Sequence, residues 1–173
     1  MGKLTLNRLI GLVLAFVMIW AGIAVYLRMP RAGATFSLSI GETRRALAKV
    51  DLPGAVFGAQ RVDLVAEPPE TGKLIWTVRR QGAEMLRYTA ALRVVNDRST
   101  QVTVSVAGPS AGANQAMGRR LDQFPAIRHL YITAMEEEIA STLEKRLFNY
   151  SILYPAIAAA SASYVGALAA QRE

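Results

Sequence analysis

Polar and apolar residues alternate along five stretches of the chain. In the longest stretch, Leu86, Tyr88, Ala90, Leu92 and Val94 face one way and the residues between them face the other. A period of two residues is typical of a β-strand with one face against a core and one face in water. Short turn segments separate the last four stretches, so we expect these strands to pair antiparallel. The predicted strands cover residues 36–40, 62–66, 74–78, 86–94 and 102–106.

Helical periodicity marks two further segments. Residues 42–50 carry Glu42 in the first turn and an apolar stripe, which predicts one short helix. Over residues 125–153 apolar side chains recur every four positions, which predicts a long amphipathic helix lying across the apolar face of the sheet. We expect Pro155 to stop or kink this helix, and residues 108–120, which have no period, to form a loop. The apolar side of the long helix carries Tyr131, Met135, Ile139, Leu143 and Leu147, and the opposite side carries Glu136, Glu137, Glu144 and Lys145.

The longest apolar run comes before all of these elements. Leu9–Leu27 contains no charged residue, and Lys3 and Arg8 precede it while Arg28 and Arg31 come after it. Its nineteen residues would form a helix of about 28 Å, close to the thickness of the hydrocarbon layer of a bilayer. The segment is therefore predicted to be a transmembrane helix.

A cleaved secretory signal is the alternative interpretation of this run. Residues 32–34 read Ala-Gly-Ala, a small-x-small sequence of the kind that signal peptidases cleave. The apolar core is longer than that of a usual signal, and two arginines precede the cleavage-like site, so an uncleaved signal anchor is favoured. Basic residues are nearly balanced on the two sides; we expect the N-terminus in the cytoplasm and the domain in the periplasm, at a bacterial inner membrane.

These elements divide the chain into five parts and define an α+β fold. After a single transmembrane helix, an antiparallel sheet of about five strands is gripped by a long C-terminal helix. The parts are a short N-terminal tail (1–8), the transmembrane helix (9–27), a linker (28–33), the α+β domain (34–154) and an Ala-rich C-terminal tail (155–173).

Composition narrows the classes of function. The chain has no cysteine, which excludes disulfides, thiolate nucleophiles and cysteine-ligated metals. Its 20 basic and 13 acidic residues give a net charge of +7, but the basic residues are spread thinly and form no run that would track a phosphate backbone. Nucleic acid is therefore not expected as a partner, whereas membrane lipid headgroups beside Arg28 and Arg31 are.

The stretch from residue 63 to residue 106 resembles the helix-grip superfamily, the START-like or polyketide-cyclase-like (SRPBCC) domains. The resemblance is carried by Leu64-Val65-Ala66-Glu67-Pro68-Pro69, Lys73-Leu74-Ile75-Trp76-Thr77-Val78, Arg87-Tyr88-Thr89-Ala90-Ala91-Leu92 and Ser99-Thr100-Gln101-Val102-Thr103-Val104. It covers residues 34–150 and implies a sheet folded around a long helix, with a cavity for an apolar ligand. Members of the superfamily usually have a second short helix and a larger sheet, whereas this sequence predicts one short helix and about five strands.

A catalytic constellation is not recognisable in the sequence. The single histidine, His129, has no second metal-ligand residue one helical turn away and is assigned to the start of the long helix. Glu136, Glu137 and Glu138 are consecutive on a helix, so they point in different directions and are expected on a solvated face. The Gly-rich stretch 108–112 lacks the lysine of a phosphate loop. We therefore expect no enzyme activity, no metal and no cofactor.

Three sets of residues remain as candidates for binding. One set lies on the apolar face of the sheet and forms either ordinary core or the lining of an apolar pocket: Phe36, Trp76, Leu86, Tyr88 and Leu92. Small residues in the anchor offer close helix packing at Gly11, Ala15 and Gly22. In the uncharged tail, Ala162, Gly166 and Ala170 recur every four positions and offer a docking track; a disordered tail and a second membrane span are the alternatives.

Two functions of different classes are consistent with these expectations. The first is a non-catalytic accessory or structural subunit of a multi-subunit membrane complex, such as a respiratory or photosynthetic one, with other subunits and membrane lipids as partners. The second is a membrane-tethered helix-grip module that binds a lipid, a quinone or another apolar molecule.

Overall fold

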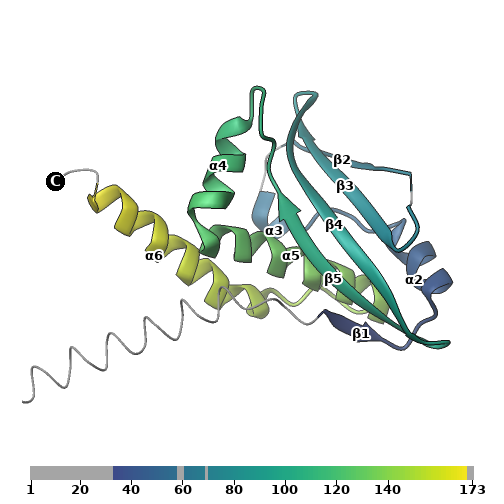
Figure 1. Cartoon of the computed structure of the whole chain (residues 1–173). Helices are drawn as coiled ribbons and strands as arrows, with labels where there is room; N and C mark the ends of the chain where they lie inside the picture. Colours follow the sequence, from purple (N-terminus) through teal and green to yellow (C-terminus); the bar gives the residue numbers. More distant parts are fainter. Residues whose placement is uncertain (1–32, 58–60, 69, 171–173) are drawn as a thin grey trace, which may run out of the picture. The chain divides into compact units, whose positions relative to one another are not determined.

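A five-stranded antiparallel sheet forms the body of the domain (Figure 1). The computed structural model describes residues 33–57, 61–68 and 70–170, with side chains up to residue 167. The strands lie in the order β1-β5-β4-β3-β2, and every neighbouring pair is antiparallel. The predicted α+β class with an antiparallel sheet is therefore confirmed. The strands are β1 (Ala34–Phe36), β2 (Asp63–Ala66), β3 (Lys73–Arg80), β4 (Ala83–Asn96) and β5 (Ser99–Ala107).

The alternation seen in the sequence sets which side of the sheet is buried. Trp76 of β3 pairs with Tyr88 of β4, which pairs with Val106 of β5, and all three side chains are buried. Several predicted apolar positions behave differently. Val94 is exposed near the end of the β4–β5 hairpin, and Ala66 is exposed on the edge strand β2. The predicted strand 36–40 is wrong beyond Phe36, where β1 ends, and Ile40 belongs to a helix.

Two short helices, not one, come after β1. Helix α2 (Ile40–Leu47) starts two residues before its predicted start because Ser39 and Glu42 form a capping box. The Ser39 backbone N–H donates to the Glu42 carboxylate at 2.9 Å. Helix α3 (Gly54–Phe57) was not predicted, since four residues are too few to show a helical period. Its Phe57 packs against Tyr131, with ring centroids 5.8 Å apart.

The segment predicted as a loop contains helix α4 (Gln115–Gln123). Only residues 108–114 form a connection, so the prediction for residues 115–120 was wrong. Close backbone packing explains why glycine is present here: a Cβ on Gly118 would lie 2.4 Å from the carbonyl oxygen of Pro109. Asn114 fixes the start of the helix, because its side-chain amide donates to the backbone oxygen of Glu84 at 2.9 Å.

Helix α5 (Pro125–Glu144) lies on one side of the sheet and contributes Met135, Ile139 and Leu143 to the core (Figure 1). It is shorter than the predicted 125–153 helix. Lys145 adopts a left-handed conformation (φ 53°, ψ 44°), which ends the helix in the manner of a C-terminal cap. Leu147, predicted on the buried face, is consequently exposed.

An ion pair holds the chain reversal after α5. Glu137 is buried, contrary to its predicted place on a solvated face, and both of its carboxylate oxygens accept hydrogen bonds from the Arg146 guanidinium. The backbone N–H of Asn149 donates to the same carboxylate at 2.7 Å. Burial alone would raise the pKa of Glu137, but these hydrogen bonds and the charge of Arg146 outweigh burial and keep the pKa below its ordinary value.

The tail is a helix. A 3-10 turn, η1 (Tyr150–Leu153), leads into helix α6 (Tyr154–Ala170). Pro155 lies in the first turn of α6, where its missing N–H leaves no helical hydrogen bond unmade, so it begins a helix rather than stopping one. Ala156 and Ala160 are buried, and α6 packs along α5. Of the helices in the described part of the chain, none has the length and apolar character needed to cross a bilayer.

Some of the predicted features fall on residues outside those described. They are the N-terminal tail 1–8, the transmembrane helix 9–27 with Gly11, Ala15 and Gly22, and linker residues 28–32. The chain divides into two units, Met1–Arg31 and Ala32–Glu173.

The close approach of Gly118 to the Pro109 carbonyl predicts that Gly118→Ala destabilises the domain. The added methyl group would overlap the Pro109 carbonyl and force the start of α4 to move, which we expect to lower the free energy of unfolding by about 1–3 kcal/mol. Chemical denaturation monitored by circular dichroism measures this change. Gly41→Ala is the control, since nothing lies within 4 Å of a Cβ there; equal stability of the two variants would contradict the close approach.

The Glu137 ion pair predicts a second stability difference. Glu137→Gln removes charge-assisted hydrogen bonds from a buried carboxylate, so we expect a loss of about 1–3 kcal/mol in unfolding free energy at pH 7. Glu144→Gln is the matched control: its exposed carboxylate also accepts from Arg146, at 2.6 Å, and its loss should cost about 0–1 kcal/mol.

The same pair gives a pH dependence of known sign. Because the pKa of Glu137 is lower in the folded protein, its contribution is present above the ordinary glutamate pKa and is lost as pH falls through the folded-state pKa. The difference in stability between wild type and Glu137→Gln should therefore shrink below about pH 4. A difference that stays constant down to about pH 2 would contradict this assignment.

Candidate functional site

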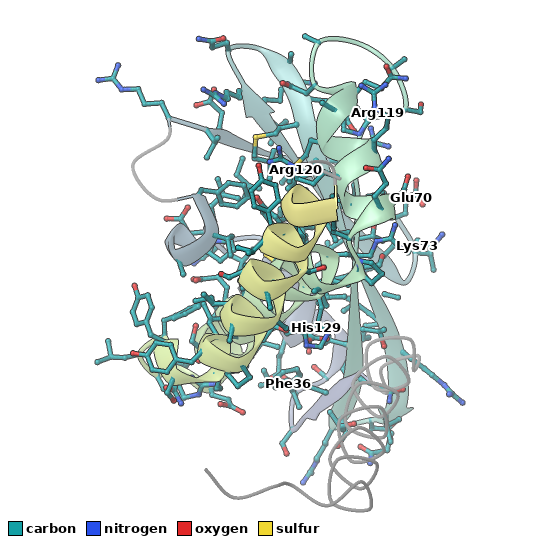
Figure 2. All side chains as sticks on the ribbon, turned by 90° about the vertical axis from the view of Figure 1, so that its left-hand side faces the viewer. Phe36, Glu70, Lys73, Arg119, Arg120 and His129 are labelled. Carbon is teal, nitrogen blue, oxygen red and sulfur yellow. The ribbon has the colours of Figure 1, made fainter. Side chains whose placement is uncertain are left out.

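The five residues proposed to be either core or pocket all lie in the same buried cluster. Leu86 and Tyr88 are completely buried, and Trp76 is 2% exposed. Figure 2 shows Phe36 at the end of the domain opposite to Arg119 and Arg120. Side chains from β1, β3 and β4 therefore meet beneath α5, as ordinary core packing requires.

This apolar cluster contains a buried phenol hydroxyl. The Tyr88 hydroxyl is buried and has no hydrogen-bond partner among the described residues. Burial, and then the nearby Tyr131, raise the pKa of Tyr88 well above its ordinary value. Burial also raises the pKa of Tyr131, although the charge of Arg120 opposes the shift. The sequence pattern places Tyr131 on the apolar stripe of the long helix, where a tyrosine is interpreted simply as a buried residue. The pattern does not show which strand residue lies opposite it, so the closeness of Tyr131 to Tyr88 could not be predicted.

The histidine and glutamates singled out in the sequence lie at successive places along α5. His129 lies half-buried on the second turn of α5, and its backbone carbonyl accepts a hydrogen bond from Thr133 at 2.9 Å. Glu137 pairs with Arg146, whereas Glu136 and Glu138 point elsewhere on the helix. Among the described residues, no group of three or more acidic or histidine side chains is placed to hold a metal ion.

A surface pocket of about 410 Å³ lies where β4 and β5 meet the connection to α4. Its charged side chains are Glu84 and Arg87. Arg87 pairs with Glu84 at 3.1 Å and with Glu67 at 3.5 Å, so its charge is already balanced. The rest of the lining comes from residues 83 and 107–113, and none of the predicted site residues takes part. This pocket offers no nucleophile with an adjacent base.

The outward side of α6 is the surface that departs most from an ordinary domain surface. All 17 residues of the helix are uncharged. Ala162 and Gly166 of the predicted docking track are exposed, together with Ile157 and Val165, while the side chain of Ala170 lies outside the described part. The buried side uses different small residues, Ala156 and Ala160, so the predicted track is not the one that packs on α5.

Aromatic contacts fix the second half of α6. The Tyr164 ring lies edge-on to Phe124, with ring centroids 6.5 Å apart. The guanidinium carbon of Arg120 lies 5.9 Å from the centre of the Tyr164 ring, which is within range of a cation–π interaction. Figure 2 shows Arg120 beside this half of the helix. These contacts hold α6 against α4 and α5 and leave its other side open.

Comparison of the chain with models of protein families, with curated proteins and with solved structures finds no match in any of the three.

Proposed function

We propose that this chain is a non-catalytic accessory subunit of a bacterial membrane complex, and that the outward side of α6 packs on another subunit. The observation that carries the proposal is a 17-residue surface helix without a single charged residue. A surface helix of a monomeric domain ordinarily places charged or polar residues opposite its buried stripe. Here that side presents Ile157, Ala158, Ala162, Val165 and Gly166.

The shape of this surface favours a helix as the partner. Small residues at four-residue spacing let two helix backbones approach closely, and Ala162 and Gly166 form such a track. Val165 is 64% exposed beside them and would bury most of its side chain on contact. Helix α6 already packs in this way against α5 through Ala156 and Ala160, so a second helix would complete its coverage.

The N-terminal apolar segment supports a membrane location for the complex. Residues 9–27 are long enough to cross a bilayer as a helix, and linker residues 28–33 can span at most about 21 Å when fully extended. The domain would therefore stay at the membrane surface. We assign the N-terminus to the cytoplasm and the domain to the periplasm, since Lys3, Arg8 and the α-amino group slightly outnumber Arg28 and Arg31.

The proposed helix-grip fold is supported by the packing of the sheet against α5. A sheet whose apolar side packs against one long helix, with two short helices after the first strand, is the arrangement expected from the resemblance to helix-grip domains. In this proposal the sheet and α5 support α6 at the surface of the domain and do not enclose a ligand.

A second candidate function, binding of an apolar ligand inside the grip, is favoured by the Tyr88 hydroxyl. A buried hydroxyl without a partner costs about 1–3 kcal/mol, and a polar atom of a bound quinone or lipid would remove that penalty. The surrounding apolar side chains of Trp76, Leu86 and Leu92 would contact the rest of such a molecule.

The docking proposal predicts that Ala162→Leu with Gly166→Leu separates the chain from its partner. Leucine side chains would block the close approach, so the partner recovered with the chain after mild-detergent purification should fall at least about tenfold. Quantitative mass spectrometry of the purified complex measures this ratio. Recovery of the wild-type chain without any stoichiometric partner would contradict the proposal.

A matched control is available on α4. Ala113→Leu with Ala116→Leu adds nearly the same bulk at two exposed positions, one just before α4 and one within it. This variant should keep the partner at the wild-type ratio. Equal loss in both variants would show that added surface bulk, and not the α6 track, causes dissociation.

The ligand candidate predicts an apolar molecule that co-purifies with the wild-type chain and is lost in Tyr88→Phe. Loss of the hydroxyl removes the polar contact proposed inside the grip, while the ring keeps its packing. Solvent extraction with mass spectrometry detects the molecule, with Tyr150→Phe, an exposed tyrosine, as the control. Ligand-free wild-type protein, made more stable by Tyr88→Phe, would show instead that this site is filled core.

A further inference from the structure

The connection between α5 and α6, residues 145–153, and the first residue of α6 carry a group of exposed apolar side chains. Leu147 is 91% exposed, Tyr154 65%, Tyr150 59% and Ile152 44%. Scattered exposed apolar residues are normal on a protein surface, but four large ones within residues 147–154 indicate a contact with a lipid surface or another molecule. We call these four residues the connection patch.

The fold forces the connection patch outward. The Glu137–Arg146 pair and the Asn149 backbone hydrogen bond fix the chain on both sides of Leu147. Leu153 is the buried residue of η1, and its neighbours Ile152 and Tyr154 point away from the core. Phe148 and Tyr150 pack ring against ring, with centroids 4.8 Å apart. The exposure is therefore a property of a fixed structure.

The composition of the patch matches the boundary between lipid headgroups and acyl chains. Tyrosines place an apolar ring in the acyl region and a hydroxyl among the headgroups, and leucine and isoleucine add buried apolar area. Exposed Lys145 adjoins the patch, the neighbouring Glu144 is paired with Arg146 at 2.6 Å, and no acidic residue occurs from residue 145 to residue 170. A cation at the edge of an apolar patch favours anionic lipid.

The patch also lies at the appropriate end of the domain. Figures 1 and 2 place β1 and the beginning of α6 at the same end, and the linker enters the domain at β1. If residues 9–27 cross the bilayer, the linker holds this end within about 21 Å of the membrane.

We propose that the connection patch inserts into the headgroup region of an anionic bilayer and gives the domain a second membrane contact. The inference rests on the anchor assigned under the proposed function. It adds the orientation of the domain, with the connection patch on the lipid and the outward side of α6 available to a neighbouring subunit.

The absence of cysteine allows a clean test with single labels. The full-length chain is reconstituted in vesicles of phosphatidylcholine and phosphatidylglycerol, with an environment-sensitive fluorophore on Leu147→Cys or Ile152→Cys. Quenching by lipids with a nitroxide on the acyl chain reports insertion, and quenching by iodide reports exposure to water. Ser110→Cys, on the exposed connection before α4, is the reference site.

We expect lipid quenching at residues 147 and 152 to exceed that at residue 110 by roughly threefold or more, with weaker iodide quenching. Carbonate extraction tests the anchor independently of the patch, because a chain with a transmembrane helix stays in the membrane under this treatment. A chain that resists carbonate but shows equal quenching at all three sites overturns the patch contact and leaves the anchor intact. A chain that carbonate removes overturns the anchor, and with it the proposed orientation.

A charge variant supplies an independent readout. Leu147→Glu with Ile152→Glu should reduce lipid quenching of a label on Tyr154→Cys to the level of residue 110, because a buried carboxylate is costly in the acyl region. Val94→Glu with Val95→Glu, two exposed valines of β4, should leave it unchanged. Label protection that appears in native membranes but is missing in pure lipid vesicles would assign the patch to a protein partner and overturn the proposal.

Discussion

The ion pair between Glu137 and Arg146 determines how the last third of the domain is built. A carboxylate removed from water is tolerable only when its oxygens are hydrogen-bonded, and Glu137 accepts from both terminal nitrogens of Arg146 and from the backbone of Asn149. These bonds close the chain around the end of α5. The helix itself ends at the left-handed Lys145, and the ion pair then holds the chain as far as Asn149, from which η1 and α6 continue.

Because of its direction, α6 has one side packed against the domain and one side exposed. Ala156 and Ala160 pack on α5, where small side chains permit close contact between helices. Tyr164 adds a ring contact with Phe124 and lies beside Arg120. The remaining side of the helix carries no charge, although nothing in the fold prevents charged residues there. A surface exposed to water would accept lysine or glutamate at Ala158 or Ala162, and the proposed packing of another subunit on this side accounts for their absence.

The sheet was predictable from local sequence, whereas much of the chain after β5 was not. Val102, Val104 and Val106 alternate with polar residues over a complete strand, so a local period determined both the strand and its buried side. Helix α4 was missed because glycine and alanine carry no apolar period, and Gly118 is explained only by its contact with Pro109. The helical pattern alone places Glu137 in solvent, because its partner lies nine residues away, beyond a helix end set by a left-handed Lys145. Contacts of this kind are tertiary, and a single sequence does not display them.

The surfaces of the domain differ in a way that bears on function. The outer side of the sheet presents Arg87, Arg93, Thr103 and Ser105, which suit contact with water. The opposite part of the fold, from Leu147 to Ala167, presents aromatic, aliphatic and small residues without charge. The proposed position at a bilayer beside another subunit accounts for this contrast, because one side would remain in water while the other would be covered by lipid and protein.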